Sequence, residues 1–475
     1  MPQVTTSDIA QNAISNTRLI AGSVIRNWQN YDGFIRAIRP RRDMFQANVN
    51  GRNMRLGDTT FLRLPNSYSV GSGPDISQTL NAIQNVLVPF PISVHQHCAL
   101  EVSNVEKTLN IEDDPRKEEW LVQTVDPMMK NLVATVAQRF ATNLTCGISS
   151  VYVTKDADGN IAPPGLNEWA QATAALERLG VPGYAYKVGI SPETSATSAV
   201  AMAQLYNPQM TIGDQTTKGR MTSPIGGVTE WHRDIYIPLL TTGTYTSGAT
   251  ATGTVTPYIQ SSTNSMSGFN TYYSNFGASV LSVTGFSGTL SRGDFITIDG
   301  VYECNRLTGK STGFLKVFTV IEDVPSGSTS IPVSPSIIAP QTPGLFTPFQ
   351  TVTASPASGA AITPVLPPDV NYRRNVMFLD DTFYLAFVEM SLETPGAYSA
   401  RVNGDADDNY FSAVASYQFN NLTYFTTLRC DILGGYTVPF SDRGIIVPHI
   451  ISSNSSTSPS AKMFKVPQGI DKLKS

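Results

Sequence analysis

A long run without any charged side chain lies in the middle of this sequence of 475 residues. Fifty-seven consecutive residues, from Ile235 to Ser291, include no Asp, Glu, Lys or Arg, so hydroxyl and amide groups must keep this segment soluble. β-Branched and aromatic residues then recur in short runs between turn residues, a pattern typical of a compact β-barrel or sandwich. These runs are Ser279–Thr284, Asp294–Glu303, Phe314–Glu322 and Ser330–Val333.

A Pro/Ala-rich stretch from Pro356 to Pro368 follows the β-rich region, and strand-like segments resume at Val376 and continue to about Val447. A chain of this length is too long for one ordinary domain. We therefore predict an α/β body interrupted by an inserted β-domain at about 241–366. Insertions of this kind are tolerated where two ends of the host chain lie close together at a surface loop.

The strongest helix signal begins at Asp114 and continues to about residue 142. An Asp that can cap the helix is followed by a Pro at its first position, and Asp126-Pro127 repeats this pattern, which predicts a kink or a restart there. If helical throughout, the segment is roughly 40 Å long, as a spine would be. The apolar face consists of Leu121, Val125, Met128, Leu132, Val136 and Phe140.

Shorter periodic segments surround this spine. Residues 1–30 are expected to form a helical arm capped at Thr17, with Ile20, Val24 and Trp28 on its apolar face. The remaining predictions are strands at 58–70 and 86–102 joined by a long loop, a hairpin at 148–163, helices at 166–179 and 191–206, a strand from Trp231 to Leu240, and a low-complexity tail.

Charge and cysteine usage exclude several classes of function. The net charge is −4 and only 15% of residues are charged, which argues against tight nucleic-acid binding and suits a surface covered by neighbouring subunits. Residues 1–63 are an exception, with nine Arg and no Lys against four Asp, which fits either a solvated arm or contact with DNA or an acidic partner. The four cysteines form no Cys-x-x-Cys pair, so we expect reduced thiols, and we expect no secretory signal and no membrane span.

Two segments partly match ligand-binding loops. Gly309-Lys310-Ser311 has the end of a phosphate-binding loop, but Cys304 stands where the first glycine is required, and the flanks read as two strands. A hairpin turn is therefore the better interpretation. Residues 405–409 have the opening spacing of a calcium loop, but Tyr410 replaces the required glycine, which favours a solvated turn.

His95 and His97 alternate along a predicted strand, so both imidazoles face the same side. Metal binding needs a third ligand, and the sequence does not place one. No Gly-x-Ser-x-Gly elbow occurs, and no catalytic triad is supported. We therefore predict no metal site, no cofactor, no catalytic residues and no enzymatic activity.

Seven segments, in order, resemble the coat proteins of tailed double-stranded DNA phages, in the branch typified by Salmonella phage P22. They are Thr60–Pro65, the helix from Asp114, Ile235–Leu240, Arg292–Val301, Val376–Asp381, Leu428–Tyr436 and Gly444–Pro448. The resemblance covers nearly the whole chain, with a similar insert in the same place.

The resemblance implies an α+β fold of the Hong Kong 97 type, with a long spine helix and an inserted β-barrel-like domain. Its regions are an N-terminal arm at 1–35, a peripheral domain at 36–164 with an extended loop at about 56–90 and the spine helix at about 114–142, a first part of the axial domain at 165–240, the insert at 241–366, a last axial and peripheral part at 367–450, and a C-terminal tail at 451–475.

The resemblance also implies a function. Such a chain is a major capsid protein that forms pentamers and hexamers of an icosahedral shell, assembled in the cytoplasm of the bacterial host around a scaffolding protein. A portal protein and encapsidated double-stranded DNA, bound without sequence specificity, are further partners, and a decoration protein is left open. Because residues 56–100 contain no Lys, we expect no Lys–Asn cross-link from the extended loop.

Structural and interface roles follow for a small set of residues. We expect the apolar spine residues to be buried, Arg292-Gly293-Asp294 to turn the chain into a strand that continues to Gly300, and Tyr272 and Tyr273 to anchor contacts between subunits. The alternative function is a β-rich phage tail or receptor-binding protein, which explains the Thr/Ser/Gly-rich middle but not the spine helix. An enzyme with a β-barrel substrate domain is a third option, but it lacks a catalytic constellation.

Overall fold

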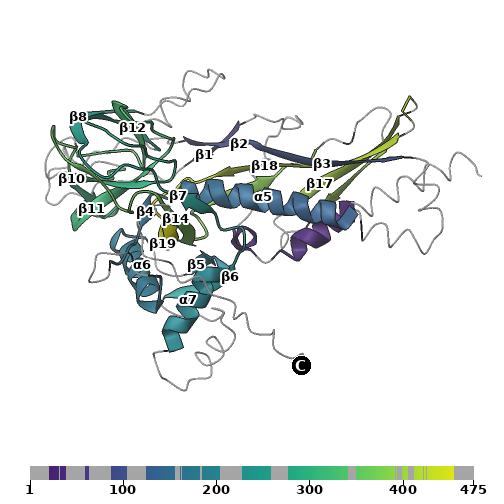
Figure 1. Ribbon diagram of the computed structural model, residues 1–475, viewed down its shortest axis with the longest axis horizontal. Coiled ribbons are helices and arrows are strands. Elements are labelled where there is room, and N and C mark those ends of the chain that lie inside the picture. Colours follow the sequence, from purple (N-terminus) through teal and green to yellow (C-terminus); the bar gives the residue numbers. More distant parts are fainter. Residues whose placement is uncertain are drawn as a thin grey trace, which may run out of the picture.

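The computed structural model shows a mixed α+β protein with three larger sheets, a two-stranded sheet and a long helix (Figure 1). This confirms the predicted α+β class. The structure describes residues 21–31, 33–38, 59–63, 87–103, 123, 125–155, 161, 163–181, 185–203, 227–257, 277–340, 349–390, 392, 398–404, 411–420, 422–423 and 425–453.

The long helix α5 begins at Asp126 and ends at Cys146. Pro127 lies in its first turn, where its missing N–H costs nothing, and Asp126 adds a favourable negative charge at the N-terminus. The second of the two predicted cap-and-proline pairs is therefore the observed start, while the first, at Asp114, lies outside the described residues. The helix ends four residues later than predicted.

The other helices are short. Residues 21–29 are helical, as expected for the arm. The side chain of Ser191 accepts a hydrogen bond from the N–H of Thr194 and so caps α7, and Glu168 accepts one from the N–H of Gly165 at the start of α6. Their bounds are Phe34–Ala37 for the 3-10 helix η1, Leu166–Arg178 for α6 and Pro192–Ala203 for α7.

An extended antiparallel sheet lies along α5 (Figure 1). Its strands lie in the order β15-β18-β17-β16. β15 pairs with the end of the long strand β18, and β3 pairs with the preceding part of β18. A separate two-stranded ladder of β1 and β2 joins the two ends of the predicted loop-bearing hairpin. The bounds are β1 Thr59–Arg63, β2 Leu87–Pro91, β3 Val94–Ser103, β15 Tyr384–Phe387, β16 Tyr398–Asn403, β17 Ser412–Asn420 and β18 Phe425–Thr437.

A second, mixed sheet has the order β4-β19-β14-β5-β6, with β7 attached to β14. The β14–β19 ladder is antiparallel, whereas β5–β6 and β19–β4 are parallel. α6 and α7 lie beside this sheet (Figure 1). The bounds are β4 Ser150–Val151, β5 Tyr186–Ile190, β6 Val228–Arg233, β7 Leu239–Thr241, β14 Val370–Phe378 and β19 Gly444–Ser453.

The third sheet is built from the segment predicted as the insert, in the order β13-β10-β11-β12-β9-β8. The N–H of Ala251 at its last strand donates to the carbonyl of Ala360 beside its first strand, at 2.8 Å, and Thr250 bridges Ala361. These bonds close the sheet on itself into a barrel. The bounds are β8 Thr250–Pro257, β9 Ser279–Thr284, β10 Phe295–Cys304, β11 Ser311–Val320, β12 Ser330–Ser334 and β13 Ile362–Pro364.

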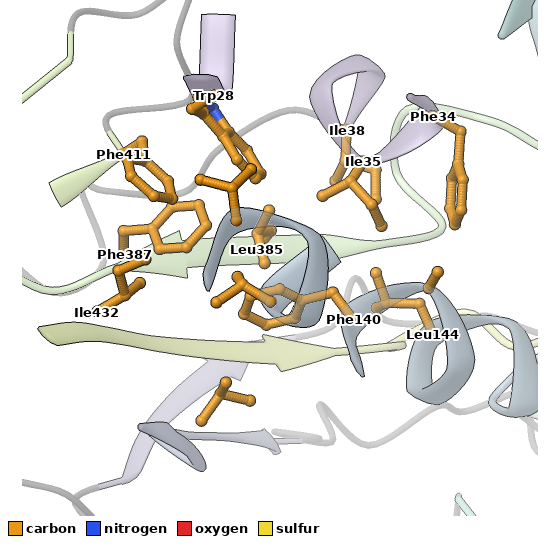
Figure 2. Close-up of a cluster of buried hydrophobic side chains, with 14 of the residues drawn as sticks. Trp28, Phe34, Ile35, Ile38, Phe140, Leu144, Leu385, Phe387, Phe411 and Ile432 are labelled. Atoms are coloured by element: carbon orange, nitrogen blue, oxygen red, sulfur yellow. The ribbon is translucent and has the colours of Figure 1, made fainter. Parts of the chain in front are cut away.

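Each part has its own apolar core. The largest packs α5 and the arm helix against the extended sheet, and Figure 2 shows Trp28, Phe387 and Phe411 together on one side of Phe140. The rings of Trp28 and Phe411 are stacked with centroids 4.5 Å apart. A second core fills the barrel with residues between Tyr245 and Ile362 only. A third lies between α6 and the mixed sheet.

Two predicted elements differ from the structure. The strand predicted from Trp231 to Leu240 is divided into β6 and β7, because the carboxylate of Asp234 accepts a hydrogen bond from the N–H of Tyr236 and turns the chain between them. In the segment predicted as a hairpin at 148–163, Lys155 does bridge Ile161, but β4 pairs in parallel with β19 instead. No helix in the described ranges is both long and apolar enough to span a bilayer.

Candidate functional site: the joint between the barrel and the body

The two chain segments that enter and leave the barrel lie side by side. Just after β7, the N–H of Thr242 donates to the carbonyl of Val370 at 3.0 Å. One residue further, the carbonyl of Gly243 accepts from the N–H of Asp369 at 3.1 Å. The two ends are therefore adjacent, which is the geometry that an inserted β-domain requires.

A buried arginine of β14 holds this joint to the long helix. The Nε of Arg374 donates to the carbonyl of Thr145 in α5 at 3.0 Å, and Nη1 donates to the carbonyl of Gly293 at 2.6 Å and to the hydroxyl of Tyr372 at 2.9 Å. Its guanidinium also lies over the ring of Phe295, 4.5 Å from the centroid. Because the side chain has no exposed surface, these acceptors take the place of water at Nε and Nη1, whereas the buried Nη2 has no hydrogen-bond partner among the described residues. One side chain thus links α5, β14 and the start of β10.

Asp294 is the acidic group of the joint. Its Oδ2 accepts hydrogen bonds from the N–H groups of Gly243 at 2.9 Å and Ser291 at 2.7 Å. Burial raises the pKa of this carboxyl to about 6, because the loss of water outweighs the two amides and the positive charge of Arg374. A cavity of about 10 Å³, lined by Asp294, Tyr245 and Pro367 among others, adjoins it and has room for about one water molecule.

The predicted turn at Arg292-Gly293-Asp294 is observed immediately before β10. Gly293 has φ = 99°, and an added Cβ would lie 3.1 Å from the Nη1 of Arg374, so a larger residue fits neither the backbone nor the contact. Gly300 also has a positive φ, of 74°, and lies where the β10–β11 register shifts. Nothing lies within 4 Å of its Cβ position, so its role is conformational.

Further contacts fix the barrel to the body away from the linker. Arg306 at the end of β10 forms an ion pair with the buried Asp442. Arg178 of α6 pairs with Glu303 at 2.9 Å between Nη2 and Oε1. The hydroxyl of Thr319 in β11 donates to the carbonyl of Ile148 at 2.8 Å. The barrel is therefore held at several separate points.

The spine residues proposed from the sequence lie in the main core where the structure describes them. Val125, Leu132, Val136 and Phe140 are all buried against the extended sheet and the arm. The predicted spine residue Leu121 lies outside the described residues, and so do Tyr272 and Tyr273, which were predicted to anchor contacts between subunits.

The three segments that partly match known ligand-binding sites have different outcomes in the structure. Gly309 has φ = 65° and its N–H donates to the carbonyl of Asn305, so the Gly309-Lys310-Ser311 segment is the hairpin turn between β10 and β11 that we predicted. The calcium-like segment at 405–409 lies outside the described residues. His95 and His97 lie on β3 as expected, and pairing with β18 places Asp431 opposite His97.

The P22 coat protein family, described as gene protein 5, matches residues 54–443, which is most of the chain. The chain belongs to the P22 coat protein family. It is a major capsid protein of a bacteriophage, a structural subunit that assembles with copies of itself into the icosahedral shell of the virion. The family match therefore favours the capsid function over the alternative of a β-rich phage tail or receptor-binding protein.

Solved structures similar to this coat protein include the capsid of the cyanophage P-SCSP1u, 10% identical, covering 83% of this chain and 84% of that chain at a TM-score of 0.36. A structure from Mycobacterium phage Che8 is 8% identical and covers 82% and 84% at 0.33. The I-domain of CUS-3 coat protein is 26% identical and covers 25% of this chain and 96% of that chain at 0.18. Scores this low do not by themselves establish a shared fold. No curated protein matches the sequence.

Sequence reasoning missed the central residue of the joint in this coat protein. Alternate residues of β14, namely Val370, Tyr372, Val376 and Phe378, are buried, and Arg374 falls on the same face. A charged residue inside an alternating apolar pattern was therefore a usable signal. Asp442, by contrast, gains its partner Arg306 through a contact between distant segments, as Asp431 gains His95, and no local pattern indicates either contact.

Proposed function

We propose that this coat protein forms both the pentamers and the hexamers of a Hong Kong 97-type shell. Assembly takes place in the host cytoplasm around a scaffolding protein, with a portal protein at one vertex. The shell encloses double-stranded DNA that it does not read by sequence, which the net charge of −4 supports. Membership in the P22 coat protein family supports these partners, and a decoration protein stays open.

The observation that carries the proposal is an apolar patch at the end of the hairpin formed by β17 and β18. This hairpin projects beyond the end of α5 (Figure 1). Leu422 at its turn is 96% exposed, and Phe419 and Phe425 beside it are 39% and 37% exposed. Large apolar side chains gathered on one exposed tip indicate an interface. In a protein that assembles with itself, a neighbouring copy is the partner that covers them.

The barrel carries a second exposed apolar patch beside the end of α6, where Leu307 is 75% and Phe314 is 55% exposed. The guanidinium of Arg178 lies 3.7 Å from the ring centroid of Phe314, so this patch borders α6. We propose that it bridges to a neighbouring capsomer. The ties at the joint support this role, because a barrel fixed at several points presents the patch in a constant orientation.

Substitution at the hairpin tip tests the proposal. Leu422→Asp is expected to leave the fold of the subunit unchanged, since the side chain is exposed, but to reduce closed shells strongly when scaffolding protein is added. Thr423→Asp places the same charge on the next residue without removing an apolar contact, and serves as the matched control. Sedimentation and negative-stain microscopy give the readout. Normal shell yield from Leu422→Asp would show that the tip is not an interface.

A further inference from the structure

Three potential metal ligands gather on one face of the extended sheet. His95 and His97 alternate along β3 and therefore point to the same side, and His97 is the register partner of Asp431 on β18. The residues that point to the opposite side of the two strands, including Cys98 and Cys430, pack in the core against α5. The three side chains thus lie on the sheet face turned away from α5.

Their distances fit a small coordination sphere. The Nε2 of His95 lies 2.8 Å from Oδ1 of Asp431, and one donor atom from each of the three residues lies within 4.8 Å of the others. The donor atoms of a tetrahedral zinc site are about 3.3 Å apart, given metal–ligand bonds of about 2.0–2.1 Å. His97 is exposed, so its side chain has room in solvent to turn toward the other two ligands.

We propose that His95, His97 and Asp431 bind one divalent cation of the zinc class, with water in the open position. Imidazole nitrogen together with one carboxylate favours Zn²⁺, Ni²⁺ or Cu²⁺ over Mg²⁺ and Ca²⁺, which prefer oxygen ligands. Each imidazole binds through a nitrogen lone pair, so His95 coordinates with Nε2 unprotonated, and any proton between Nε2 and Asp431 passes to solvent.

Arg429 is the competitor for this site. Its Nε lies 2.8 Å from Oδ2 of Asp431 and its Nη2 lies 2.7 Å from Oδ1, a bidentate ion pair. In the structure, both Arg429 and His95 lie within hydrogen-bond distance of this carboxylate. The Arg429 side chain is 46% exposed, so it can move into solvent when a cation replaces it. The competing interpretation is that these residues form only a charge network on the sheet surface.

A bound cation would have a structural effect. His95 and Asp431 are 336 positions apart in the sequence. His95 lies on β3, and Asp431 lies on β18, the strand that pairs with β3 in the extended sheet. A ligand that binds only the folded arrangement stabilises it by mass action. The cation would therefore act as a clip between β3 and β18, and shell stability would depend on its concentration.

Calorimetric titration of the chelator-treated, full-length coat protein with Zn²⁺ tests the proposal. His97→Ala removes an exposed ligand and is expected to weaken binding by at least about tenfold, because even the loss of a residue that only supports a metal ligand costs about 10–100-fold. His232→Ala is the matched control, because His232 also lies beside a carboxylate, that of Glu230, at 3.3 Å. It is expected to bind Zn²⁺ as the unaltered protein does. Circular dichroism confirms that each variant is folded.

Two further measurements separate the metal site from the charge network. Arg429→Gln removes the competing donor and is expected to raise the affinity for Zn²⁺. Replacement by Co²⁺ is expected to give a tetrahedral spectrum without a thiolate charge-transfer band, which excludes the four cysteines as ligands. Unchanged binding in His97→Ala, weaker binding in Arg429→Gln, or a thiolate band would each overturn the proposal.

Discussion

The Nη1 of Arg374 donates to the carbonyl oxygen of Gly293 at 2.6 Å, so a buried hydrogen bond joins the body of this coat protein to the barrel at the turn before β10. The same guanidinium also bonds to Thr145 of α5. A side chain that belongs to neither α5 nor the barrel therefore links the two, in addition to the direct hydrogen bond from Arg292 to Asn143 of α5.

Arg374→Met tests this dependence. The variant has a similar volume but takes away the short hydrogen bond to the buried carbonyl of Gly293, and a buried group that loses its partner costs about 1–3 kcal/mol. The carbonyl of Thr145 keeps the N–H of Ile148. We expect a loss of about 2 kcal/mol in urea unfolding of the soluble subunit. Arg401→Met, which removes a partly exposed ion pair with Glu389, is expected to cost no more than about 1 kcal/mol. Equal losses in the two variants would contradict the role of Arg374.

Leu132→Asp tests the spine. Leu132 is 4% exposed in the main core, where an unpaired carboxylate is severely penalised, so we expect a loss of more than about 4 kcal/mol and a sharp fall in soluble subunit. Gln138→Asp introduces the same charge on the exposed side of α5 and is expected to be nearly neutral. Yield and thermal unfolding are the measurements. Assembly of Leu132→Asp at normal yield would show that this face is not buried.

Asp294 predicts a dependence of stability on pH. Its pKa in the folded protein is about 6, above the usual value of 3.8. Its contribution to stability is therefore fully present below about pH 4 and is lost as the pH rises through about 6. Both amides donate to Oδ2, so a proton on Oδ1 breaks neither bond.

The comparison variant is Asp294→Asn, which cannot titrate. Between pH 4 and pH 7 we expect the free energy of unfolding of the unaltered protein to fall relative to the variant by about 2 kcal/mol, since about two pKa units separate the folded and unfolded states. Chemical unfolding at a series of pH values measures the difference. A constant difference would mean that Asp294 titrates normally.

Residues 241–366 are predicted to fold alone. Among the described residues, the barrel core is made of residues of this segment, and its sheet closes without strands from the body. The excised segment is expected to show a β-type circular dichroism spectrum and cooperative melting. A disordered spectrum would mean that the ties to α6 and β14 are needed for folding, and would leave the capsid function untouched.

The cysteines should differ in reactivity. Burial raises the pKa of the Cys430 thiol to about 12 and that of Cys304 to about 11, so almost no thiolate forms at neutral pH. Cys98 and Cys146 are only half-buried. Alkylation of native protein, followed by mass spectrometry, is expected to label Cys98 and Cys146 first. Early labelling of Cys430 would show that the extended sheet opens.

Local sequence signals predicted much of the fold. The bounds of β9 and the identity of α6 and α7 follow from periodicity and caps, and the start of α5 follows from Asp126-Pro127. Pairing between distant strands did not follow. The β3–β18 ladder, which brings Asp431 to His97, joins segments more than three hundred residues apart, and nothing local in either strand specifies its partner.

The candidate site was only partly predictable for the same reason. The turn at Gly293 and Asp294 was recognisable from its residue types, and the spine face from its spacing. Burial of Arg374 could have been predicted only by accepting a charged residue as part of the alternating apolar pattern of β14. Its acceptors on Thr145 and Gly293 could not be inferred, because they are backbone carbonyls placed by tertiary structure.

The closure of the barrel between Thr250 and Ala361 has a consequence for a protein that meets many copies of itself at high local concentration. An open sheet presents a row of unpaired N–H and C=O groups, onto which any extended chain can add regardless of its side chains. Along the seam of this barrel, N–H and C=O groups of the two edge segments already bond to each other. Neighbouring subunits must therefore recognise the barrel through side chains, so association there depends on sequence and not on generic strand addition.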